Sequence, residues 1–133
     1  TEQWIEYFQI MKPLYTQYIP SADEPENLFL QKDTMSIECL NEGFKGFLKE
    51  FNYLPFLEKI RAKTLILCGK ADFICDYQYS ILMAKKIPHA SLVIYSCPHA
   101  VTIDKHEDYI NVSKDFILEN TLTSDFLVKE QYD

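Results

Sequence analysis

The sequence predicts an α/β fold in which a helical segment precedes a β-α-β-α unit with two parallel strands. In the first half of the chain, apolar residues recur at steps of three and four, as they do on one face of a helix. In the second half, two short continuous apolar runs alternate with two helical stripes. Such runs are typical of strands that are buried on both faces of a parallel sheet.

The first half predicts two amphipathic helices and a polar loop between them. The first helix covers residues 2–18, the loop covers residues 21–27, and the second helix runs from about residue 34 to 51. Asp33 or Thr34 can cap the second helix. The aromatic stripe of the first helix is interpreted as packing; it includes Trp4, Phe8 and Tyr15.

Two glycines interrupt the second helix, and a short connector follows it. Gly43 and Gly46 each weaken a helix interior by up to about 1 kcal/mol, and they can instead permit a kink or close packing. Residues 55–60 are expected to be a connector packed by Phe56 and Leu57.

The second half predicts strand, helix, strand and helix. The strands are residues 64–68 and 92–95, and the helices are residues 77–87 and 105–119. The face of the first of these helices is expected to consist of Tyr79, Leu82, Met83 and Ile87. A β-α-β crossover makes the two strands parallel and the connection right-handed. The tail after residue 119 could add a short turn through Phe126 and Leu127, or fray.

Composition excludes several classes of protein. The chain of 133 residues has 13 basic and 20 acidic side chains and a net charge of −7, so we expect no nucleic-acid partner. No apolar run approaches the roughly 20 residues of a transmembrane helix, so we expect no membrane partner. Because no secretory signal is visible either, the expected location is the cytoplasm.

The four cysteines are expected to be reduced thiols. Cys68 ends an apolar run and is interpreted as a core residue. Cys97, His99 and His106 lie close in sequence, but their spacing matches no usual set of four zinc ligands. We therefore expect no metal site and no cofactor. His89 and His106 are interpreted as structural.

An acid and an imidazole follow the two predicted strands. Asp72 lies in the loop after the first strand and His99 in the loop after the second. Functional residues of open parallel sheets collect beyond the carboxyl ends of the strands, so Asp72 and His99 should lie side by side. A carboxylate beside an imidazole holds the ring in one tautomer and stabilises its protonated form. Asp76 is a second candidate for the acid, although a helix cap is the simpler interpretation of it.

These loops also carry a family resemblance. The stretch from Leu57 to Leu118 contains a G-x-x-D loop that begins at Gly69 and a P-H pair at Pro98, and it resembles the C-terminal part of an α/β-hydrolase. Within that superfamily it is most similar to enzymes of the proline iminopeptidase type. The resemblance implies that Asp72 is the triad acid and His99 the general base.

The resemblance also implies the organisation of the chain. Residues 1–60, with WIEYF and KPLY, look like the helical lid of such an enzyme. Residues 61–120 would be the C-terminal part of the core, and residues 121–133 a tail. The predicted fold is therefore a partial α/β-hydrolase fold.

The nucleophile of this family is missing from the 133 residues. The fold places its serine in a G-x-S-x-G elbow, and no glycine of this chain lies in such a motif. A complete enzyme of this type needs roughly 200–250 residues or more, and the chain begins at Thr1 without methionine. We therefore expect a C-terminal fragment that is inactive alone.

The resemblance implies the release of N-terminal proline from peptides by the intact protein. The alternatives are an esterase or another acyl hydrolase, or a non-catalytic module for binding or association. Glu38 and Glu42 could hold a substrate amino group as lid carboxylates, but an exposed, solvated pair is the simpler interpretation, and neither is assigned. The open edge of the strand at residues 64–68 also predicts self-association.

Overall fold

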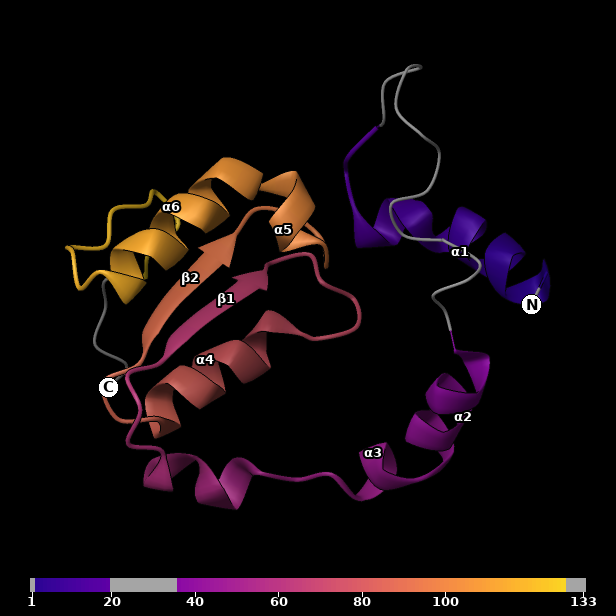
Figure 1. The fold of residues 1–133 in the computed structure, drawn as a ribbon, viewed down its shortest axis with the longest axis horizontal. Helices are drawn as coiled ribbons and strands as arrows, with labels where there is room; N and C mark the ends of the chain where they lie inside the picture. Colours follow the sequence, from indigo (N-terminus) through magenta and orange to yellow (C-terminus); the bar gives the residue numbers. More distant parts are fainter. Residues whose placement is uncertain (1, 20–35, 129–133) are drawn as a thin grey trace. The chain divides into compact units, whose positions relative to one another are not determined.

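The computed structural model describes residues 2–19 and 36–128. The predicted loop at residues 21–27 and the caps at Asp33 and Thr34 lie outside the described residues, as do the side chains of Trp4 and Phe8. The elements are, in chain order, α1 (Glu2–Tyr15), α2 (Ile37–Lys45), α3 (Phe47–Glu50), the 3₁₀ helix η1 (Leu54–Lys59), β1 (Leu65–Gly69), α4 (Tyr77–Lys86), β2 (Ser91–Tyr95), α5 (Val101–Asp104) and α6 (His106–Ile117) (Figure 1).

The chain divides into two compact units. The first contains residues 1–11 and 19–53, and the second contains residues 12–18 and 54–133. None of the described helices is long and apolar enough to cross a membrane.

The second unit is built on two parallel strands. β1 and β2 pair in parallel, from Leu65 opposite Ser91 to Gly69 opposite Tyr95. This confirms the predicted β-α-β-α unit, whose strands end within one residue of the predicted positions.

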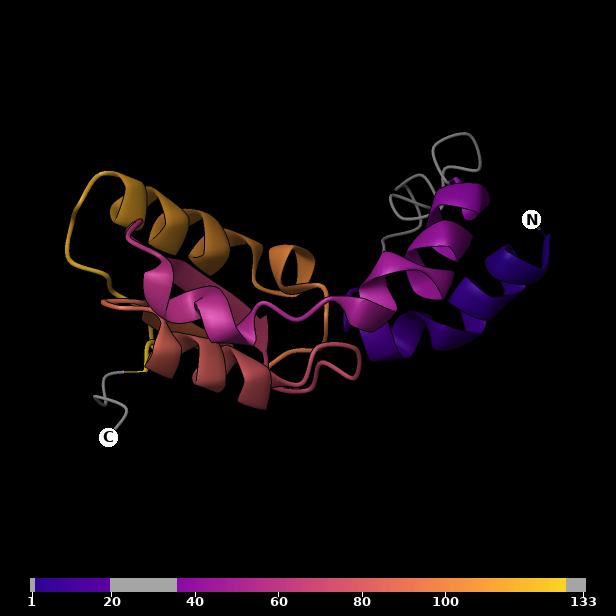
Figure 2. The same ribbon diagram turned by 90° about the horizontal axis from the view of Figure 1, so that it is seen from below.

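Helices cover both faces of this sheet, so the unit has three layers. α4 lies on one face and α6 on the other (Figures 1 and 2). Alternate strand residues point to opposite faces: Ile66, Cys68 and Leu92 pack with α4, whereas Val93 and Tyr95 pack with α6. Cys68 is buried as predicted.

The buried face of α4 differs from the predicted one. Ser80, Ala84 and Ile87 are buried, whereas Tyr79 is 64% exposed. The small side chains of Ser80 and Ala84 let the helix approach the sheet closely, which turns the large Tyr79 outward. The predicted stripe is therefore right for Ile87 and for Met83, which packs against the core, and wrong for Tyr79. It missed Ser80 and Ala84 because periodicity favours large apolar residues over small ones.

The last predicted helix is confirmed as α6, but a short helix precedes it. α5 is a single turn at Val101–Asp104, and Lys105 separates it from α6. Val112 of α6 is completely buried, whereas Ile117, the last residue of α6, is 75% exposed.

The tail after α6 returns to the sheet. The amide of Ile94 donates to the Phe126 carbonyl at 3.0 Å, and the amide of Val128 donates to the Leu92 carbonyl at 3.0 Å. Leu127 thereby forms an antiparallel bridge with Val93. The described part of the tail neither frays nor forms only a turn, since it covers the outer edge of β2.

The helices of the first half are shorter than predicted. α1 ends at Tyr15, and α2 begins after Ser36, whose hydroxyl accepts from the Cys39 amide. Gly46 adopts a non-helical conformation and separates α2 from α3. A Cβ atom there would lie 2.9 Å from the Glu42 carbonyl oxygen, so this conformation suits a residue without a side chain. The glycine thus breaks the predicted helix.

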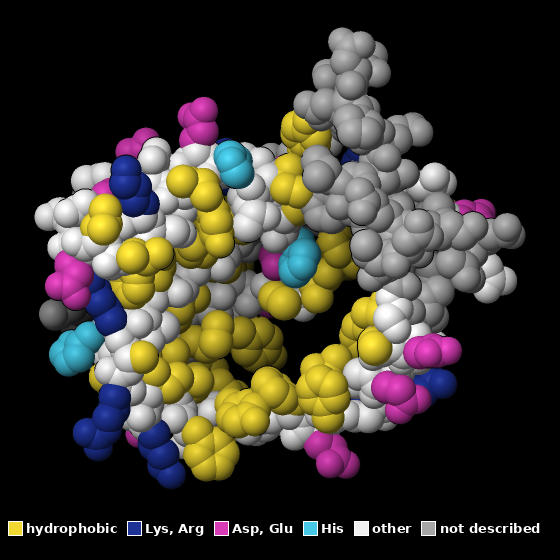
Figure 3. Space-filling model, viewed as in Figure 1, with side chains coloured by type: hydrophobic (Ala, Val, Ile, Leu, Met, Phe, Trp, Pro, Cys, Tyr) yellow, Lys and Arg dark blue, Asp and Glu magenta, His cyan; other side chains and the backbone are white. Residues whose placement is uncertain are grey.

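Large apolar side chains are exposed on α2, on α3 and in the segment that follows (Figure 3). They are Phe44, Phe47, Leu48, Phe51, Tyr53 and Phe56. Phe56 is 51% exposed, whereas Leu57 is buried as expected.

Candidate active site

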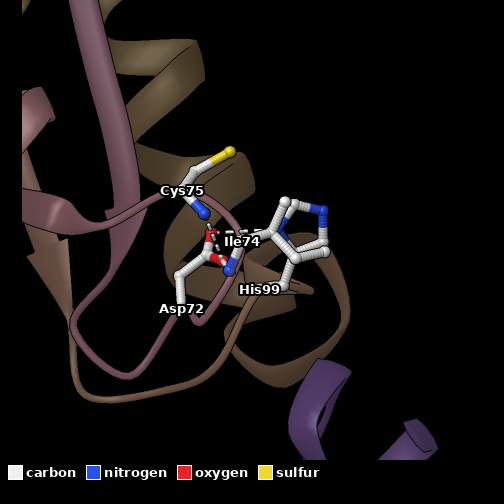
Figure 4. Close-up of polar contacts among 4 residues, drawn as sticks. All are labelled: Asp72, Ile74, Cys75 and His99. Carbon is white, nitrogen blue, oxygen red and sulfur yellow. Dashed lines mark hydrogen bonds and ion pairs between the residues drawn. The ribbon is translucent and has the colours of Figure 1, made fainter. Parts of the chain in front are cut away.

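Asp72 lies in a tight loop that begins where β1 ends. Its Oδ1 accepts hydrogen bonds from the backbone amides of Ile74 at 2.9 Å and Cys75 at 3.0 Å (Figure 4). Its side chain is only 6% exposed. Burial by itself would raise the pKa of Asp72, but the Cys75 amide, the His99 ring and the Ile74 amide together hold that pKa below its ordinary value. Asp72 is therefore a fixed, ionised carboxylate at neutral pH.

His99 faces this carboxylate from the loop that follows β2. Its Nδ1 lies 2.8 Å from Oδ2 of Asp72. With Nδ1 donating to Asp72, the opposite ring nitrogen, Nε2, is left as a proton acceptor and points away from the carboxylate (Figure 4). The His99 side chain is 40% exposed. The imidazole is thus oriented and still accessible.

A close crossing of the two loops brings these side chains together. The amides of Lys70 and Ala71 donate to the carbonyls of Tyr95 and Cys97, at 2.8 and 3.1 Å. At Gly69 a Cβ atom would lie 2.0 Å from the Pro98 carbonyl oxygen, so no side chain fits there. The glycine that begins the G-x-x-D loop is required by this approach of one backbone to the other.

The end of α1 and the residues just after it contact the loop that carries His99 and the short helix α5 that follows it. The Ala100 amide donates to the Tyr15 carbonyl at 2.8 Å, and the Tyr15 ring meets His99 edge-on with centroids 5.7 Å apart. Asp104 accepts from the Thr16 hydroxyl and from the Gln17 amide. Tyr15 thus also contacts the candidate base, in addition to any packing role in the helical stripe.

Cys75 is the third side chain at this place. A ligand atom of Cys75, one of Asp72 and one of His99 all lie within 4.8 Å of one another. Burial, followed by the Asp72 charge, raises the pKa of the Cys75 thiol. Proximity in the sequence suggested Cys97, rather than Cys75, as the cysteine near His99. Cys97 is completely buried, and burial followed by the Asp104 charge raises its pKa to about 11.

The other candidate residues have structural partners or lie elsewhere. Asp76 caps α4 by accepting from the Gln78 amide at 2.9 Å, which is the simpler interpretation of it. His106 begins α6 and its Nδ1 contacts the Thr102 carbonyl. Glu38 and Glu42 are exposed on α2, in the first unit.

Two supports of the site were not predicted. The Asp72 carboxylate accepts hydrogen bonds from the amides of the residues two and three positions later in the chain. Aspartate favours this kind of local turn, so the D-x-x-C stretch could have suggested it. The contact from Tyr15 has no signal in the sequence, because it joins segments more than 80 residues apart.

Comparison with known proteins gives one significant curated relative. Proline iminopeptidase PfmaB of Pestalotiopsis fici is 30% identical over 102 residues, which are 74% of this chain. The chain spans about a third of that protein's length, 34%. No protein-family model matches the chain.

A solved structure also matches part of the chain. It is the esterase EaEST from Exiguobacterium antarcticum, with a TM-score of 0.45 and 25% identity over 47% of this chain and 24% of that one. The curated match covers 74% of this chain, which contains a parallel β-α-β-α unit, and it relates the chain to the α/β-hydrolases.

Proposed function

We propose that this chain supplies the acid and the base of a serine hydrolase that resembles proline iminopeptidase. In this proposal Asp72 is the acid, His99 is the base, and the nucleophile belongs to a part of the protein outside these 133 residues. The observation that carries the proposal is the 2.8 Å contact between His99 Nδ1 and Asp72 Oδ2, with Nε2 left free to accept a proton. The relation to a curated hydrolase supports it.

The chemistry follows from the two ring nitrogens. Nε2 of His99 takes the proton of a serine hydroxyl as its oxygen attacks the scissile carbonyl, and the negative charge of Asp72 stabilises the imidazolium that forms. The imidazolium then gives this proton to the leaving amine or alcohol. In the second half of the reaction, His99 takes a proton from water as the water attacks the acyl-enzyme, and the imidazolium then returns this proton to the serine oxygen as the acid is released.

The proposed substrate is a small peptide with an N-terminal proline, because the curated relative is named a proline iminopeptidase. An ester or another acyl compound is the alternative within the same mechanism. The third alternative, a non-catalytic binding module, is kept because the 133 residues contain no G-x-S-x-G elbow.

The test is hydrolysis by the protein expressed from its whole coding region. We expect prolyl-p-nitroanilide to be cleaved, and we expect His99→Ala and Asp72→Asn each to lower kcat by about 10⁴-fold. Asp76→Asn is the matched control, because asparagine also caps a helix and kcat should stay within about twofold. His89→Asn is a second control, since asparagine tolerates the positive φ of 59° at that position.

Different results would select the alternatives. Cleavage of p-nitrophenyl acetate without cleavage of the prolyl substrate would make the protein an acyl hydrolase of another specificity. Full activity of His99→Ala would remove His99 from the mechanism. Turnover by the 133 residues alone, with the same sensitivity to His99→Ala, would contradict the proposed external nucleophile.

A further inference from the structure

Three different metal-binding side chains meet where the two loops cross. Asp72 and Cys75 come from the loop after β1, and His99 comes from the loop after β2 (Figure 4). One ligand atom from each lies within 4.8 Å of the other two. The approach of the loops at Gly69, which leaves no room for a side chain, brings the three together.

We propose that Asp72, Cys75 and His99 bind a thiophilic divalent cation, with Zn²⁺ as the prime candidate. Zinc is bound at about 2.3 Å by thiolate sulfur and at about 2.0–2.2 Å by nitrogen or oxygen, so neighbouring donors lie about 3.3–3.7 Å apart. The three ligand atoms already lie within 4.8 Å of one another, and the exposed side chains of Cys75 and His99 can rotate toward this range. A water molecule can supply the fourth ligand.

The charges of the three side chains suit a divalent cation. On binding, the ion displaces the proton of the Cys75 thiol to solvent. The resulting thiolate and the Asp72 carboxylate together carry two negative charges, and the imidazole binds in its neutral form. Cys75 and His99 are both exposed residues, so an ion reaches them from solvent. Oδ1 of Asp72 is held by two backbone amides, so the ion would bind Oδ2, the oxygen that His99 Nδ1 contacts.

The cation competes with the hydrogen bond of the proposed dyad. Oδ2 of Asp72 is the oxygen that faces His99 Nδ1 at 2.8 Å, so an ion bound to Oδ2 takes the place of that bond or lengthens it. Binding by itself does not depend on the proposed hydrolase activity, and it is measured on the chain without substrate.

The first test is calorimetric titration of the reduced 133-residue chain with Zn²⁺. We expect one ion per chain, with at least tenfold weaker binding by Cys75→Ser and by His99→Gln. The matched controls are Cys39→Ser, which removes another exposed thiol, and His89→Asn, which removes another imidazole. Unchanged affinity in Cys75→Ser, or equal losses in the two controls, would overturn the proposal.

The second test needs no variant, so it does not depend on the folding of one. Zn²⁺ should slow the alkylation of Cys75 by iodoacetamide at least tenfold, as followed by peptide mass spectrometry. Cys39 in the same sample is the internal reference, and its rate should not change. Equal rates for Cys75 with and without Zn²⁺ would exclude this site.

Discussion

Gly69 has no side chain, and this allows the loop that carries Asp72 to contact the loop that carries His99. A methyl group there would lie 2.0 Å from the Pro98 carbonyl oxygen and 2.5 Å from that of Cys97, and both are backbone atoms that have little freedom to move. The same contact holds the loop of Asp72 against the loop of His99. Stability and site geometry therefore depend on one position.

We expect Gly69→Ala to lower the free energy of unfolding by about 1–3 kcal/mol, because the loops must separate to admit the methyl group. Urea denaturation measures the loss. Gly43→Ala is the control, since its Cβ would meet the nearest atom, in the Leu48 side chain, at 3.4 Å. That variant should be neutral or gain up to about 1 kcal/mol from its better helix propensity.

Asp72 makes the stability of the second unit depend on pH. Its pKa in the folded chain lies below the unfolded value, so its contribution is complete above about pH 4 and is lost as the pH falls through the folded value. Asp72→Asn removes this contribution at neutral pH. The difference in unfolding free energy between wild type and Asp72→Asn should therefore shrink from pH 7 to pH 3, and a constant difference would contradict the assignment.

At the scale of elements, the short segment after α1 is tied to α5 by one carboxylate. Asp104 accepts from the Thr16 hydroxyl and from the Gln17 amide, and Thr16 is 4% exposed. The three- and four-residue spacing of apolar side chains continues through Tyr18, which is why the sequence predicted a helix through residue 18. In the structure the helix ends at Tyr15, and these long-range hydrogen bonds determine the position of the residues that follow.

We expect Asp104→Ala to cost about 1–3 kcal/mol, because it leaves a buried hydroxyl and a backbone amide without their acceptor. Asp115→Ala is the control: Asp115 accepts from the exposed Asn120 side chain, and its loss should cost less than about 0.5 kcal/mol. Denaturant unfolding of both variants gives the comparison, and equal losses would argue against a special role for Asp104.

The strands and their order were predicted from the sequence, and several contacts were not. Continuous apolar runs such as residues 64–68 reflect burial on both faces of a sheet. A helical crossover between two such runs makes the strands parallel. The position of Asp72 beside His99 followed from this topology. The sequence indicated a possible kink at Gly46, whereas the single turn of α5 and the pairing of the tail depend on tertiary contacts. Local patterns carry no information about them.

The tail stabilises the fold through its backbone hydrogen bonds as well as through its side chains. Val128→Pro removes the amide that donates to the Leu92 carbonyl, whereas Val128→Ala keeps it. We expect the proline variant to be less stable than the alanine variant by about 1–3 kcal/mol, because Leu92 is 1% exposed and its carbonyl loses a partner. Thermal unfolding of the pair measures the difference, and equal midpoints would show that the tail is held by side chains alone.

At the scale of the whole molecule, the two edges of the sheet are unlike. The tail pairs with the outer edge of β2, whereas no strand of the described residues pairs with the outer edge of β1. An open apolar edge is a template for another strand. We therefore expect the isolated chain to self-associate, and light scattering at high concentration checks this. A monodisperse monomer would contradict it.

The covered edge of β2 also limits how far such association can proceed. Two chains that meet through β1 would form a continuous sheet whose two outer edges both belong to β2, and each of these edges is already occupied by the tail. In such a pair the outermost backbone at each end is the short tail segment at residues 126–128, which offers few groups for a further strand, so addition of a third chain is disfavoured. By occupying one edge, residues 126–128 of the tail would favour a pair of chains over a fibre.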